Sequence, residues 1–407
     1  MSSPPRFLQC RHRLDASLPR TLSYCLALSS IFVCSLYVLV PPPVRRLPRD
    51  DPSHVRWRAV IVLAVSAAGV GAYPWLFCDD DISHHGDNVS SSLSSPPPWY
   101  AYLGFTWTPM QDVRIAMHVL SLYLGALSCS WLRVYHHGRI LRREEEEEER
   151  MMMDHRKEGG GMRRQLPISP GPKHLFRSLA TTRLRPMRRY LASLLADEGL
   201  RWTTVRDLAV APLAEEAIFR SCLLPPLLAA CCRRGGVETA MGDDGSSRGR
   251  GGGALSPASA SWIAPLFFGV AHLHHLYERI RRIPPAMRSN KAIPTRIILG
   301  VVVQWTYTTL FGAYASHVFV RTGSLGAATT AHVVCNYMGL PEVGPFVDPT
   351  SILRGYRWFI ATMYLAGIWL FVSAFDSPAI FPGESVLPSL LYPATVDGPS
   401  SSQFVAA

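Results

Sequence analysis

Apolar residues gather along this chain into runs of about twenty, which charged or Pro- and Gly-rich stretches separate. A helix needs about twenty apolar residues to cross the hydrocarbon core of a bilayer. The pattern predicts an all-α fold: a polytopic integral membrane helical bundle with about eight transmembrane helices. The predicted spans cover residues 22–40, 58–78, 113–132, 207–230, 256–276, 297–320, 324–340 and 357–375. The first run is too long for a typical signal-peptide core, so a retained span is expected.

The basic residues predict how the bundle is oriented. The formal net charge is +11, and membrane proteins concentrate Lys and Arg in short cytosolic loops. The loops before the second span and after the third and fifth spans are rich in these residues, whereas residues 78–111 and the tail after 375 contain none. We therefore expect the basic loops in the cytosol and the other two segments in the lumen. Arginines in residues 1–20 and 233–250 oppose this orientation. The basic residues are expected to orient the bundle in the membrane and to contact anionic lipid. They are not expected to bind nucleic acid.

Composition also divides the chain. Residues 1–140 form an N-terminal region with three predicted spans, and residues 141–182 form a low-complexity cytosolic linker that contains an acidic run. Arg183–Arg206 is interpreted either as an amphipathic helix on the cytosolic surface or as an ordinary connector. Residues 343–407 hold the last span and a lumenal tail.

Ionisable residues inside a span are costly, and each one is a candidate functional residue. The fourth span contains Glu215, Glu216 and Arg220. Glu216 and Arg220 are four residues apart, so they share a helix face and can form an ion pair. Glu215 points about 100° away from its neighbour on an ideal helix. It is free to face a cavity, where a carboxylate could act as a general base.

Two further spans carry histidines. His272 lies about one turn from the cytosolic end of the fifth span. In the seventh span, His332 and Asn336 are four residues apart, and both can donate hydrogen bonds to a developing negative charge. With the predicted orientation, these three residues and Glu215 lie at a similar depth in the cytosolic half of the bilayer. Cys335 is predicted to pack rather than to act as a nucleophile.

The motifs Glu215-Glu216-x-x-x-Arg220, Phe268-x-x-x-His272 and His332-x-x-x-Asn336 occur in order, each in its own predicted span. Together they resemble the three motifs of the type II CAAX prenyl endopeptidases, the eukaryotic branch of the CPBP/ABI intramembrane proteases. The resemblance covers about residues 200–342, and residues 183–342 are expected to form the catalytic domain.

This resemblance implies an enzyme of the endoplasmic reticulum membrane that faces the cytosol and binds prenylated C-termini. Such enzymes remove the last three residues from prenylated Cys-a-a-X proteins. It further implies that Glu215 activates water with help from His272, that Glu216 supports catalysis, that Arg220 gives structural support, and that His332 and Asn336 stabilise the transition state.

Metal dependence is an open alternative at this stage. Glu215, His272 and His332 are ligand types that suit zinc, although no HExxH signature is present. Hydrolysis without a cofactor is the preferred hypothesis. The rival functions are a transporter whose intramembrane charges line an ion pathway and a non-catalytic membrane scaffold.

Overall fold

The structure, a computed structural model, describes residues 17–77, 99–105, 108–136, 197–232, 257–271, 292–375 and 377–381, together with residues 139, 143, 147 and 150. Helices dominate these segments and no strand occurs among them, which confirms the all-α fold class. The chain divides into two compact units. The first unit draws on Met1–Met117, Thr203–Tyr337 and Asp376–Ala407, and the second on His118–Trp202 and Met338–Phe375.

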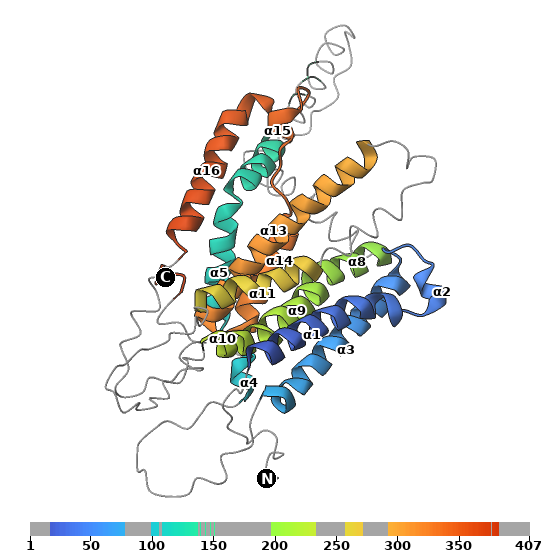
Figure 1. The fold of residues 1–407 in the computed structure, drawn as a ribbon. Coiled ribbons are helices and arrows are strands. Elements are labelled where there is room, and N and C mark those ends of the chain that lie inside the picture. Colours follow the sequence, from blue (N-terminus) through green and yellow to red (C-terminus); the bar gives the residue numbers. More distant parts are fainter. Residues whose placement is uncertain are drawn as a thin grey trace, which may run out of the picture. The chain divides into compact units, whose positions relative to one another are not determined.

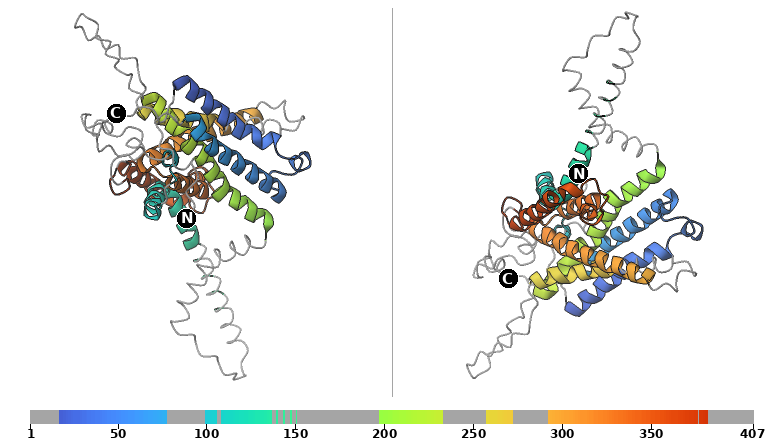
Figure 2. Two further views of the ribbon diagram at one scale, coloured as in Figure 1. Left: turned by 90° about the horizontal axis from the view of Figure 1, so that it is seen from below. Right: turned by 90° about the horizontal axis from the view of Figure 1, so that it is seen from above.

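Two long apolar helices of the first unit, α1 (Leu18–Val38) and α3 (Pro52–Phe77), lie side by side (Figures 1 and 2). The short helix α2 (Pro42–Arg45) connects them. The Arg45 side chain donates hydrogen bonds of 2.9 and 3.0 Å to two carbonyl oxygens at the end of α1. Carbonyl groups there lack partners within the helix, and a cation suits the negative end of the helix dipole. Arg45 therefore stabilises the turn between α1 and α3.

The helical stretch that follows in the first unit is divided into five parts. These are α8 (Glu198–Val205), η2 (Arg206–Val210), α9 (Ala211–Glu216), η3 (Ala217–Cys222) and α10 (Leu224–Cys232). The segments η2 and η3 are π-helical turns on either side of α9. The sequence predicts one span over residues 207–230, and two π turns divide the helix in that stretch.

Prolines explain where the π turns fall. Pro212 and Pro225 each lack the N–H group that an α-helix would donate to the carbonyl four residues earlier, and those carbonyls lie inside η2 and η3. The backbone forms wider hydrogen bonds there, such as the one from the Leu223 amide to the Ile218 carbonyl at 3.1 Å. Such π turns are rare in proteins overall, and those that occur are often found at functional sites.

Three more helices complete the part of the first unit that surrounds α9. They are α11 (Pro257–Ala271), α13 (Ala292–Thr322) and α14 (Leu325–Met338). Helices α11 and α13 pack closely, and a Cβ atom on Gly312 would lie 3.1 Å from the Cβ of Pro265. Because Gly312 has no side chain, the two backbones can approach each other at this crossing.

The short helix α4 (Trp99–Tyr102) leads into a turn that joins two parts of the first unit. The Leu103 carbonyl accepts a 2.6 Å hydrogen bond from Ser221 Oγ, and the Gly104 carbonyl accepts one of 2.8 Å from the Leu325 amide. Gly104 has a φ of +70°, which residues with a side chain rarely adopt. A Cβ atom there would also lie 2.5 Å from the Phe319 ring. The turn thus requires glycine for two independent reasons.

In the second unit, the end of α5 (Pro109–Leu122) packs on α16 (Arg357–Ser373). His118 Nε2 donates to the Phe371 carbonyl at 2.9 Å. A second helical segment, Leu124–His136, follows α5 after a bend of 75°. The short elements α15 (Gly344–Val347) and η5 (Arg354–Tyr356) precede α16. The apolar core of this unit contains Cys129, Leu132, Leu353 and Ile360.

Among the described residues, three helices are long and apolar enough to span a membrane. They are Leu18–Val38, Pro52–Phe77 and Ile297–Thr322, and the bent pair that contains α5 would make a fourth. Large apolar side chains such as Leu26 and Trp75 are 60% and 84% exposed, as expected where lipid replaces water. The chain is therefore a multi-spanning membrane protein.

Gly104→Ala is expected to destabilise the protein. The left-handed backbone alone costs about 1–2 kcal/mol for a residue with a side chain, and the contact with Phe319 adds to this cost. The melting temperature of the protein in detergent should therefore fall. Gly71→Ala is the matched control, because a Cβ on Gly71 in α3 would meet nothing within 4 Å. It should leave the melting temperature unchanged or raise it. Equal losses in both variants would contradict this account of the turn.

Candidate active site

The two adjacent glutamates at the end of α9 lie in different environments. The Glu216 side chain is fully buried, whereas the Glu215 side chain is 20% exposed. Glu216 forms an ion pair with Arg220, with 3.0 Å between Oε2 and Nε. This is the pair that the spacing of four residues predicts, and it forms across the π turn η3.

The Arg220 side chain is almost completely enclosed, with 1% of its surface exposed. Besides the carboxylate of Glu216, its Nη2 donates to the Gly312 carbonyl at 3.2 Å. Its guanidinium carbon lies 4.7 Å from the ring centroid of Phe268 and 5.8 Å from that of Phe311. Aromatic rings attract a cation through their negative faces. The cost of burying this charge is therefore offset by groups from α9, α11 and α13.

His332 in α14 lies between the two glutamates. Its Nδ1 is 2.8 Å from Glu216 Oε1, and its Nε2 is 3.8 Å from Glu215 Oε2. A carboxylate only accepts hydrogen bonds, so Nδ1–H donates to Glu216. The Phe311 ring, 4.7 Å from the imidazole centroid, packs against the same side chain. Glu216 thereby holds the imidazole so that Nε2 faces Glu215.

Asn336 lies one turn further along α14. Its Nδ2 donates to the Asp207 carbonyl in η2 at 2.9 Å. This carbonyl is in a π turn, where the ordinary helical hydrogen bonds are disturbed. An amide nitrogen carries two N–H groups, and the contact uses one of them. Asn336 is thus fixed relative to α9 with a donor left over.

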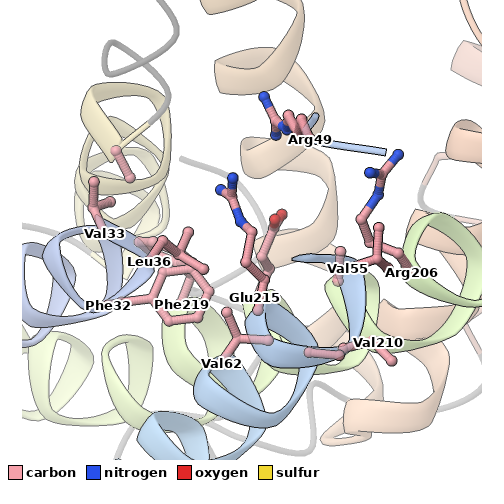
Figure 3. A pocket seen from close by; sticks show the side chains of 14 residues that line it. Phe32, Val33, Leu36, Arg49, Val55, Val62, Arg206, Val210, Glu215 and Phe219 are labelled. Carbon is pink, nitrogen blue, oxygen red and sulfur yellow. The ribbon is translucent and has the colours of Figure 1, made fainter. Parts of the chain in front are cut away.

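Glu215 lines a pocket of about 760 Å³, including the space open to its surroundings (Figure 3). Apolar side chains from four parts of the first unit form most of its wall, and Arg49, Arg58 and Arg206 add charge. In Figure 3, Glu215 points toward the edge where Arg49 and Arg206 lie, while Phe32 lies to its left and Val62 lies below it. The complete lining comprises Phe32, Val33, Leu36, Arg49, Val55, Arg58, Ala59, Val62, Arg206, Val210, Ala211, Glu215, Phe219 and Ala271.

Arg206 is held by two carboxylates at the pocket edge. Its Nη1 is 2.9 Å from Asp50 Oδ1, and its Nε is 2.7 Å from Asp207 Oδ1. Burial lowers the pKa of Arg206, but its hydrogen bonds to Asp207 and Asp50 outweigh that effect and the pKa is raised. Arg206 therefore connects the loop before α3 to η2.

The structure brings together most of the side chains that the motifs single out. Glu215, Glu216, Arg220 and His332 form one connected group, and Asn336 anchors to η2. His272 lies outside the described residues, although Ala271, which precedes it, lines the pocket.

Within the described segments, no group of three or more His, Cys, Asp or Glu side chains is arranged to hold a metal ion. The zinc alternative needs His272 in addition to Glu215 and His332. Its full ligand set therefore extends beyond the residues whose positions the structure gives.

Sequence reasoning missed several contributors. Phe311 and Gly312 lie in α13, between the motifs, and nothing in their sequence context marks them as partners of Arg220. Arg49 and Arg58 were interpreted only as orienting charges, yet both line the pocket. Contacts between distant helices, rather than local spacing, place these four residues at the site.

Comparison with known proteins agrees with these motifs. Residues 197–338 match the family model described as type II CAAX prenyl endopeptidase Rce1-like. The chain is 38% identical over 160 residues to human CAAX prenyl protease 2, an alignment that covers 39% of each protein. It is 39% identical over 162 residues to CAAX prenyl protease 2 of Arabidopsis thaliana, covering 39% of this chain and 42% of the relative. The probable CAAX prenyl protease 2 of Schizosaccharomyces pombe is 33% identical over 166 residues, covering 41% and 49%. No solved structure matches the chain significantly.

The chain thus aligns with about two-fifths of the length of the first two of these relatives. The residues that match the family model, 197–338, contain both glutamates, Arg220, His332 and Asn336. Residues 197–338 of this chain are therefore similar to the Rce1-like type II CAAX prenyl endopeptidases.

Proposed function

We propose that this protein is a membrane endopeptidase that removes the last three residues from prenylated Cys-a-a-X proteins. The observation that carries the proposal is the asymmetry of the adjacent glutamates. Glu216 is buried and bound by Arg220 and His332, while Glu215 faces a pocket with largely apolar walls. A carboxylate that faces a pocket can activate water as a general base. The apolar walls of the same pocket suit a substrate that carries a lipid.

In the proposed reaction, Glu215 carries a proton from the attacking water to the leaving nitrogen. Its carboxylate removes a proton from a water molecule, whose oxygen bonds to the carbonyl carbon of the prenylated cysteine while the carbonyl electron pair moves onto its oxygen. Collapse of this intermediate breaks the C–N bond, and the leaving nitrogen takes the proton from Glu215. The products are a C-terminal prenylcysteine carboxylate and a free a-a-X tripeptide.

His332 and Asn336 act on the charge that develops during this attack. To donate to this charge, His332 carries a proton on both ring nitrogens, with Nδ1–H bonded to Glu216 and Nε2–H directed to the reacting oxygen. The separation of 3.8 Å between His332 Nε2 and Glu215 Oε2 exceeds a hydrogen bond, so a reacting oxygen can contact both groups. The remaining Asn336 N–H is a second donor for the oxyanion, and the contact with the Asp207 carbonyl positions it. Glu216 and Arg220 hold His332 in place, and His272 assists the base.

The cellular setting follows from the same proposal. The bundle has about eight spans in the endoplasmic reticulum membrane, with the active site in the cytosolic half. The prenyl chain enters sideways from the bilayer, because it is itself a lipid. The a-a-X peptide arrives from the cytosol, where the basic loops lie.

Glu215→Gln should abolish cleavage of a farnesylated Cys-a-a-X peptide without unfolding the protein. The amide cannot accept the proton of water, so kcat should fall by roughly 10²–10⁴-fold. Glu215 is partly exposed and outside the Arg220 ion pair, so the melting temperature should stay unchanged. Mass spectrometry of the released tripeptide and a thermal melt provide the two readouts. A variant that cleaves at the normal rate would disprove the role of Glu215.

Glu216→Gln should reduce both stability and activity. Removal of one partner from a buried ion pair costs about 3–5 kcal/mol, because the other charge is left uncompensated. The same two measurements distinguish this variant from Glu215→Gln. If Glu216→Gln kept its melting temperature, the proposed dependence of the fold on the Arg220 pair would be wrong.

Asn336→Ala should lower kcat by roughly 10²–10³-fold and leave KM nearly unchanged, as expected for a donor that acts mainly in the transition state. Asn336 is exposed, so the fold should tolerate the change. Steady-state kinetics with the farnesylated peptide test this. A rise in KM with kcat unchanged would instead assign Asn336 to substrate binding.

A chelator should leave cleavage by the wild-type protein unchanged, because the proposed base is a free carboxylate. The comparison uses farnesylated and geranylgeranylated peptides with and without chelator. Loss of activity that zinc restores would overturn the metal-independent mechanism. If neither peptide were cut under any condition, the scaffold function would replace the proposed one.

A further inference from the structure

The pocket beside Glu215 is built largely by residues outside the family-matched domain. Eight of its fourteen lining residues come from α1, from the loop before α3, and from α3 itself, all of which precede residue 197. Ser66 in α3 also donates to the Ala214 carbonyl in α9 at 3.3 Å, so α3 lies directly against the helix that carries Glu215. The N-terminal helices are therefore part of the site.

Arginines outnumber carboxylates among the residues that line the pocket. The lining contains Arg49, Arg58 and Arg206 and one carboxylate, that of Glu215. Arg206 is already committed to Asp50 and Asp207 through three hydrogen bonds. Each guanidinium carries five N–H donors and can bind a carboxylate through two of them at once. Arg49 and Arg58 can therefore bind an anionic ligand in addition to the contacts that they make within the protein.

The proposed substrate brings such an anion at a defined distance. Three residues separate the bond to be cut from the free C-terminal carboxylate. An extended chain covers roughly 3.3–3.6 Å per residue, so the carboxylate lies about 10 Å beyond the reacting carbonyl. A receptor for it must lie in the same pocket as the base, and both arginines do.

We infer that Arg49 and Arg58 bind the C-terminal carboxylate of the a-a-X peptide and thereby position the third peptide bond from the end at Glu215. The inference rests on the proposed function and deepens it. It assigns selection of the cleavage position to residues that the family match does not cover. The apolar walls supplied by α1 and α3 would then face the side chains and the prenyl group of the substrate.

The test compares two farnesylated peptides that differ only at the C-terminus, one with a free carboxylate and one with an amide. The full chain is reconstituted in phosphatidylcholine vesicles, with and without an anionic lipid. The proteins are wild type, Arg49→Gln/Arg58→Gln, and Arg49→Lys/Arg58→Lys. The matched control is Arg56→Gln, since Arg56 is an exposed residue of α3 outside the pocket lining. A thermal melt of each variant verifies folding.

Wild type and Arg56→Gln should prefer the carboxylate peptide in kcat/KM by roughly 10- to 100-fold, the usual effect of a charged hydrogen bond. The double glutamine variant should lose this preference because only the carboxylate peptide is cut more slowly, and the double lysine variant should recover part of it. Equal slowing of both peptides would indicate a structural role and overturn the inference.

The other outcomes are also decisive. If the glutamine variant kept the preference but lost a dependence on anionic lipid, the arginines would bind headgroups and the inference would be wrong. A wild-type protein that cuts both peptides equally well would overturn the carboxylate receptor while supporting the proposed function. A wild-type protein that cuts neither peptide would overturn both.

Discussion

The buried ion pair between Glu216 and Arg220 is the interaction on which the rest of the site depends. An arginine with 1% of its surface exposed is stable only if nearby groups compensate its charge. Here a carboxylate from α9, the Gly312 carbonyl from α13, and the rings of Phe268 and Phe311 do so. These groups come from three helices, so the charge of Arg220 also determines how those helices pack. Loss of either member of the pair would leave its partner buried and uncompensated.

The same pair separates the roles of two neighbouring glutamates. Glu216 uses one oxygen for Arg220 and the other for His332, which leaves it no free oxygen to face the pocket. Glu215 projects into the pocket, within 3.8 Å of the other nitrogen of His332. The π turns on both sides of α9 belong to this arrangement, because η3 begins directly after Glu216 and contains Arg220, and η2 supplies the carbonyl that binds Asn336. A series of polar contacts through Glu216 and His332 thus connects the buried Arg220 to Glu215, the candidate base.

The sequence predicts those structural features that depend on residues close together along the chain. Runs of apolar residues indicated the helices, and the spacing of four residues indicated the Glu216–Arg220 pair. The π turns were not predicted, because the apolar run over residues 207–230 indicated a span without indicating where its hydrogen bonding changes. The contact of Arg220 with α13 and the arginines in the pocket lining depend on tertiary packing between distant segments. No spacing rule encodes such contacts. The predicted partner His272 and the loop after it lie outside the described residues, and the count of about eight spans stays a prediction.

The most direct test of the central claim replaces the ion pair as a whole. Glu216→Met and Arg220→Met should each lower the melting temperature strongly, while the double variant should recover most of the loss, because no buried charge remains without a partner. Cleavage of the farnesylated peptide should stay low in all three variants, since His332 has lost the carboxylate that orients it. Recovery of both stability and cleavage in the double variant would show that the pair serves the fold alone. A double variant that is no more stable than the single variants would show that the two charges do not stabilise each other.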